Sequence, residues 1–164
     1  MAGIDRLFSS RPIAADVGLL IVRAGIGTSM LVLHGWGKIT GGPEFWAQVG
    51  KAMSNVGITF APAAWGFLAA FSEFGCSILI ILGVLFRPAA AMLAFTMLVA
   101  GTHHLSLPPD HPGGGLNAAS HALELGCVYI GLLLTGPGRY SVARLVGKGD
   151  AATSGELPAP DRLR

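Results

Sequence analysis

Four long apolar segments constrain the fold of this chain more than any other feature of its sequence. They lie at about 16–35, 62–86, 88–105 and 117–135, and each is long enough to cross a hydrocarbon core about 30 Å thick as a helix. Only 12% of the 164 residues are charged, against about 25% in an ordinary soluble domain. None of the four segments has the polar stripe of a soluble helix. The sequence therefore predicts an all-α integral membrane four-helix bundle.

The remaining segments are predicted to lie outside the hydrocarbon core. Between the first and second spans, apolar side chains recur near helical spacing, which predicts a short amphipathic helix at the membrane interface. These side chains are Phe45, Trp46, Val49, Met53 and Val56. The helix is interpreted as an interfacial anchor or as a lid over a site. Residues 147–164 are rich in Gly, Ala, Pro and charge and are predicted to be a disordered cytoplasmic tail, which leaves 1–146 as the membrane domain.

The distribution of basic residues predicts the orientation of the chain. With four spans, both termini and the middle loop share one side of the membrane, and only Lys38 and Lys51 fall on the other. The basic residues on the shared side are Arg6, Arg11, Arg87, Arg139, Arg144, Lys148, Arg162 and Arg164. Because short cytoplasmic loops carry the excess of Lys and Arg, both termini are predicted to be cytoplasmic.

All five histidines are predicted to lie at or beyond the outer face. They are His34, His103, His104, His111 and His121. Four of them, all except His111, fall at one depth on three helices, which is how a helix bundle builds a ligand or metal site. Chance clustering at the interface is the alternative. The four histidines are therefore candidate ligands of haem iron or copper, or part of a quinone head-group site.

Three ionisable residues, Arg23, Glu73 and Glu124, fall inside the predicted spans, where such residues are rare and usually paired. Helix rise places the two glutamates at nearly the same depth. Arg23 lies about two turns lower, within reach of either carboxylate if its side chain points upward. The triad is interpreted either as a structural lock on the bundle or as a proton relay to the outer histidines.

Each intramembrane glutamate precedes a cysteine by three residues, in the near-repeat EFGC at 73–76 and ELGC at 124–127. Cys76 and Cys127 are therefore predicted at one depth, about one turn below the glutamates. Two such thiols can form a disulfide, bind copper(I), or serve as small apolar residues at helix contacts. The sequence leaves these three alternatives open.

Two stretches give the chain a family resemblance. The segment LLIVRAGIGTSMLVLHGWGKI places an Arg in the first span and His-Gly-Trp-Gly-Lys at its outer end, and SEFGCSILIILGVLFRPAAAMLAFTMLVA follows with its Glu. With GPGRYSV after the fourth span, this pattern resembles the DoxX family of small four-helix membrane proteins, over about 17–142. The positions that match are Arg23, His34, Gly35, Gly37, Lys38, Glu73 and Arg139. Trp36 lies inside the same motif and joins Lys38 as a candidate cofactor-binding residue.

The resemblance implies a bacterial inner-membrane component of a redox system. Its family is named after a subunit of a thiosulfate:quinone oxidoreductase, so an oxidoreductase subunit is one expectation, with a quinone, haem or copper as candidate cofactor and redox proteins as partners. The charged residues Arg23, Glu73 and Glu124 would then exchange protons. A ligand-free membrane scaffold and a small transporter are the alternatives, and a homo-oligomer is compatible with each. No nucleic-acid partner is expected.

Overall fold

The computed structural model describes residues 14–108 and 110–145, and within these ranges it contains helices and connecting turns but no strand. Four of its helices are long and apolar enough to cross a membrane, at Ala15–Ile39, Pro62–Leu82, Phe86–Ser106 and Gly115–Thr135. The predicted all-α membrane bundle is therefore confirmed. The predicted tail at 147–164 lies outside the described residues.

The first two spanning helices are each interrupted by a wider, π-helical turn. The first consists of α2 (Ala15–Ser29), the π turn η1 (Met30–Gly35) and α3 (Trp36–Ile39). The second consists of α5 (Pro62–Phe71), the π turn η3 (Ser72–Cys76) and α6 (Ser77–Leu82). The other two are the unbroken helices α7 (Phe86–Ser106) and α8 (Gly115–Thr135).

The second span ends four residues before the predicted boundary at 86. Gly83 and Leu85 both adopt a left-handed backbone, with φ of +71° and +44°, and a left-handed residue ends an α-helix. Pro88 then falls in the first turn of α7, where a missing backbone N–H costs no helical hydrogen bond. The turn between the two spans is therefore tight, and α7 follows α6 directly.

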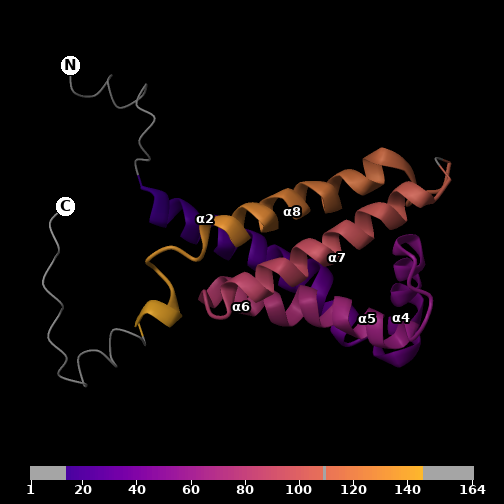
Figure 1. Cartoon of the computed structure of the whole chain (residues 1–164), viewed down its shortest axis with the longest axis horizontal. Coiled ribbons are helices and arrows are strands. Elements are labelled where there is room, and N and C mark those ends of the chain that lie inside the picture. Colours follow the sequence, from indigo (N-terminus) through magenta and orange to yellow (C-terminus); the bar gives the residue numbers. More distant parts are fainter. Residues whose placement is uncertain (1–13, 109, 146–164) are drawn as a thin grey trace, which may run out of the picture.

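The predicted interfacial helix is present as α4 (Gly42–Gly50), followed by the 3-10 helix η2 (Lys51–Val56). It lies across one end of the bundle and packs on α5 (Figure 1). We call this end the α4 end. The start of α2, the turn at 83–85 and the end of α8 lie at the opposite end (Figure 1), which we call the terminal end.

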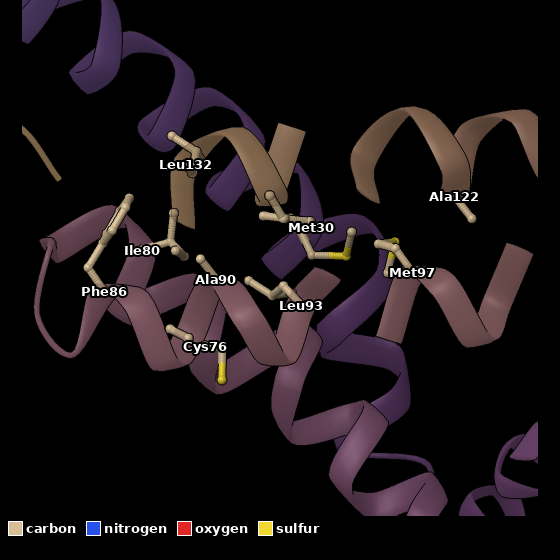
Figure 2. Close-up of a cluster of buried hydrophobic side chains, with 11 residues drawn as sticks. Met30, Cys76, Ile80, Phe86, Ala90, Leu93, Met97, Ala122 and Leu132 are labelled. Atoms are coloured by element: carbon tan, nitrogen blue, oxygen red, sulfur yellow. The ribbon is translucent and has the colours of Figure 1, made fainter. Parts of the chain in front are cut away.

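A cluster of buried side chains from all four spans forms the core, and Figure 2 shows that its members converge between the helices. Its members are Met30, Cys76, Ile80, Phe86, Ala89, Ala90, Leu93, Met97, Ala122, Tyr129 and Leu132. Two of its members on α7 are the alanines Ala89 and Ala90, and such small residues allow neighbouring helices to approach closely, as is typical of membrane bundles. The most extensive pairing is the α7–α8 hairpin.

Candidate functional site

The two π turns pack directly against each other. A Cβ atom on Gly35 would lie 2.7 Å from the carbonyl carbon and oxygen of Glu73, so only glycine permits this approach of η1 to η3. The Ser77 hydroxyl donates a hydrogen bond of 2.6 Å to the same Glu73 carbonyl. Because π turns inside α-helices are frequent at functional sites, the contact between η1 and η3 is a candidate functional region.

An ion pair lies beside this contact. The Lys38 ammonium on α3 donates to both carboxylate oxygens of Glu73, at 2.5 and 2.7 Å. Glu73 is 2% exposed and Lys38 is 28% exposed. Glu73 lies midway along its spanning helix, so the pair places a charged carboxylate deep in the bundle and satisfies it there, as intramembrane charges require.

A cavity of about 190 Å³ opens from this ion pair toward the α4 end. Apart from Lys38 and Glu73 its lining is almost entirely apolar and comes from α4, η2, α5 and α7. These lining residues are Val49, Gly50, Ala52, Met53, Trp65, Leu68, Ala69, Met92, Phe95, Thr96, Val99 and Ala100. An apolar pocket with a few convergent polar groups is the usual form of a small-molecule site.

One lining residue of this cavity carries a further polar group. The indole N–H of Trp65 is buried and has no hydrogen-bond partner among the described residues, although Trp65 lines the cavity. Trp65, Ala69 and Glu73 are spaced four residues apart and so share one face of the helix. This spacing was a signal in the sequence that could have identified Trp65, which the sequence-based prediction did not include.

The α4 segment is held over the cavity by its own contacts. The Trp46 indole N–H donates a hydrogen bond of 2.7 Å to the Lys38 carbonyl oxygen, and its ring meets Phe67 edge-on with centroids 5.0 Å apart. Cβ atoms on Gly50 and Gly66 would overlap the carbonyl oxygens of Pro62 and Trp46. The helices α4 and α5 are therefore in backbone contact, and α4 covers the α4 end of the cavity.

The four candidate histidines form two pairs. The rings of His34 and His121 have centroids 5.4 Å apart, and those of His103 and His104 are 5.8 Å apart. Asn55 lies 3.3 Å from Nδ1 of His103, and Nδ1 of His104 lies 2.7 Å from the Gly113 carbonyl oxygen. Over 14–108 and 110–145, no three His, Cys, Asp or Glu side chains are grouped to hold a metal ion, so the predicted metal site gains no support.

The prediction that Arg23 reaches Glu73 or Glu124 is wrong. Among the residues that the structure describes, Lys38–Glu73 is the only ion pair, and the Arg23 guanidinium instead lies against Gly83 at the terminal end. Glu124 is exposed on α8, whereas Glu73 is buried. The three side chains do not meet because Arg23 extends toward the nearer end of the bundle, away from the glutamates. Long cationic side chains commonly extend in this way.

The two near-repeats also differ in their surroundings. Both cysteines are free, but Cys76 is 1% exposed with its sulfur 3.8 Å from the Met92 sulfur, while Cys127 is exposed. The two thiols therefore lie in different surroundings, one inside the bundle and one on its surface. Trp36, a candidate cofactor residue, is 60% exposed, and its ring lies 5.9 Å from that of Phe74, outside the cavity.

The sequence of this chain was compared with those of known proteins and protein families. The DoxX family model matches residues 18–105, and Inner membrane protein YqjF of Escherichia coli (strain K12) is 32% identical over 136 residues, which cover 81% of this chain and 95% of the relative. The chain belongs to the DoxX family. No solved structure matches it.

The DoxX match contains the whole cavity and its ion pair, since Lys38, Trp65, Glu73 and the lining residues of α7 all lie within 18–105. The helix α8, with His121, Glu124 and Cys127, lies beyond the matched residues. The candidate site of this DoxX protein is therefore built from the part of the chain that defines the family.

Proposed function

We propose that this DoxX protein is an inner-membrane component of a redox system that binds the head group of a membrane quinone or quinol in the cavity beside Lys38 and Glu73. One observation carries the proposal: an apolar cavity within the bundle ends on a buried carboxylate that is paired with a lysine. A quinone head group needs such a combination, because its ring is apolar and its two oxygens require hydrogen-bonding partners.

The size of the cavity suits a single ring. A volume of about 190 Å³ exceeds the roughly 150 Å³ of an engineered apolar cavity that binds benzene. The isoprenoid tail would remain among the lipids, since Leu68 and Phe95, which line the cavity from α5 and α7, are 41% and 47% exposed. The lipid-soluble ligand would thus enter sideways between these two helices.

The polar groups of the cavity provide both donors and an acceptor. The ammonium group of Lys38 has three N–H donors, of which two serve Glu73, and the Trp65 indole N–H has no partner in the described part of the chain. Quinol oxidation releases two protons and two electrons. We assign the first proton to the Glu73 carboxylate, the second proton to water outside the membrane, and both electrons to a redox-protein partner, with Lys38 donating a hydrogen bond to the ring oxygen.

The location is part of the proposal. The related Escherichia coli protein is named as an inner membrane protein. Arg87 and Arg144 line a cavity at the terminal end together with Asp16, and the Arg139 backbone N–H donates to the Asp16 carboxylate. The excess of arginine on this side supports an orientation with the termini in the cytoplasm. The Lys38–Glu73 cavity then opens toward the outer half of the membrane.

Binding of decylubiquinone to the detergent-purified protein tests the proposal, with quenching of tryptophan fluorescence as the signal. We expect saturable binding that weakens about tenfold or more in Glu73→Gln and Lys38→Met, because each removes a hydrogen-bonded charge from the head-group site. Glu124→Gln is the matched control, since it removes the same charge from the exposed face of α8, and it should bind as the wild type does. Fluorescence quenching that does not saturate would contradict the proposal. So would an equal loss of decylubiquinone affinity in Glu124→Gln.

A second candidate function, a membrane scaffold, is favoured by the exposed face of α8. Glu124 lies near the middle of this spanning helix and is exposed together with His121 and Cys127. A carboxylate facing lipid at this depth is costly, and contact with another protein helix would relieve that cost.

Oxidative cross-linking in native membranes tests the scaffold function. Cys127 is exposed on the same helix as Glu124 whereas Cys76 is buried, so we expect a cross-linked band that disappears in Cys127→Ser and persists in Cys76→Ser. A monomer under all oxidising conditions would count against this second function.

A further inference from the structure

Arg23 is a buried cation that neither the ion pair nor the cavity at the α4 end uses. Its side chain is 2% exposed, and neither Nε nor Nη1 has a hydrogen-bond partner among the described residues. Buried polar groups are almost always satisfied, and a charge inside a membrane bundle is normally paired. These two N–H groups therefore point to a partner that carries negative charge.

A second unsatisfied group lies beside Arg23. Ser141 is 1% exposed, and its hydroxyl also has no partner within the described part of the chain. A Cβ atom on Gly83 would overlap Nη1 of Arg23 and would lie 2.6 Å from Cβ of Ser141. Both unsatisfied groups thus meet at Gly83, which also has a left-handed φ of +71°.

A cavity of about 530 Å³ adjoins the same place at the terminal end. Gly83 lines this cavity, whereas Arg23 and Ser141 are buried next to Gly83 and do not line the cavity themselves. Arg87 and Arg144 line it as well, and both are exposed.

The balance of charge around this terminal cavity is positive. Among the described residues, Asp16 is the one acidic residue that lines it, and the Asp16 carboxylate already accepts a hydrogen bond of 2.8 Å from the Arg139 backbone N–H. Three guanidinium groups, those of Arg23, Arg87 and Arg144, remain without an ion-pair partner in the described ranges. The net positive charge favours an anionic ligand.

We propose that the terminal cavity binds a phosphate-type oxyanion, carried either by the head group of an anionic phospholipid or by free phosphate. Guanidinium groups present paired N–H donors that match phosphate oxygens, and the Ser141 hydroxyl adds a further donor. The cavity lies where the spanning helices begin and end, at the level of the lipid head groups, and basic pockets between transmembrane helices at this level bind anionic lipids. The site is independent of the quinone proposal, because it shares no residue with the Lys38–Glu73 cavity.

The experiment compares two sources of the oxyanion in nanodiscs. In one arm, phosphatidylglycerol replaces part of the phosphatidylcholine, and lipid binding is measured by native mass spectrometry. In the other arm, inorganic phosphate is titrated into protein in phosphatidylcholine alone, and the thermal midpoint is followed. A response to phosphatidylglycerol only would identify a lipid ligand, and a saturable response to inorganic phosphate would identify a soluble one.

Variants make the result specific to this cavity. Arg144→Gln should weaken binding about fivefold, the effect of one basic residue at a membrane surface, and Arg23→Gln should weaken it more. Ser141→Ala and Arg87→Gln keep the test valid if Arg23→Gln does not fold.

Arg139→Gln is the control with the same charge change, since the Arg139 guanidinium lies over the Tyr140 ring and does not line the cavity. Equal effects of Arg139→Gln and Arg144→Gln, or no response in either arm, would overturn the proposal.

Discussion

Replacing Lys38 with methionine is expected to lower the free energy of unfolding by about 3 kcal/mol, because removing one partner of a buried ion pair leaves an uncompensated charge. The charge left behind is the Glu73 carboxylate, which is only 2% exposed. Glu73→Gln should cost less, about 1.5 kcal/mol, since Lys38 is 28% exposed and its ammonium can turn toward the surface. Unfolding in mixed micelles with increasing dodecyl sulfate provides the measurement.

The double variant Lys38→Met/Glu73→Met distinguishes pairing from other causes. Replacing both partners of a buried pair with apolar residues is often neutral, so the double variant should recover most of the stability lost in Lys38→Met. Glu124→Gln, on the exposed face of α8, should not lower the stability. Additive losses in the double variant would mean that Lys38 and Glu73 do not interact.

The contact between α4 and α5 gives the second large effect. Gly66→Ala is expected to destabilise the protein by about 3 kcal/mol, at the upper end of what overpacking costs. The added Cβ would overlap the Trp46 carbonyl oxygen, and backbone cannot move aside as a flexible side chain can. Separation of α4 from α5 would also open the cavity, so the variant should bind decylubiquinone more weakly.

Gly25→Ala is the matched control for this variant. Gly25 also lies within a spanning helix, but a Cβ atom there would have no atom within 4 Å, and substitutions at such positions are usually within about 0.5 kcal/mol of the wild type. Thermal unfolding of the purified variants provides the measurement. Equal thermal midpoints for Gly66→Ala and Gly25→Ala would show that α4 does not pack on α5 as described.

The fold was predictable because it depends on long apolar segments. Each span is defined by about twenty residues, so errors of a few residues at an end do not change the bundle. The second span ended early because Gly83 ends α6 with a left-handed backbone. Leu85 is also left-handed although it is not a glycine, and nothing in the composition indicates that conformation.

The site was predictable only in part. Glu73 was predicted as an intramembrane carboxylate and Lys38 through the family motif, but their pairing was not. A regular helical spacing was assumed through His34 and Glu73, and both lie in π turns, where an extra residue per turn rotates the following side chains. The sequence pattern also treated EFGC and ELGC as equivalent, whereas tertiary packing buries the first glutamate and exposes the second.

Photoaffinity labelling with an azido-ubiquinone, followed by mass spectrometry of the labelled peptides, tests the central claim most directly. The proposed site predicts adducts within 49–53, 65–69 or 92–100, the segments that line the cavity, with protection by excess decylubiquinone and loss in Glu73→Gln. Protected adducts beside His34 and His121, or labelling that excess quinone does not prevent, would contradict it.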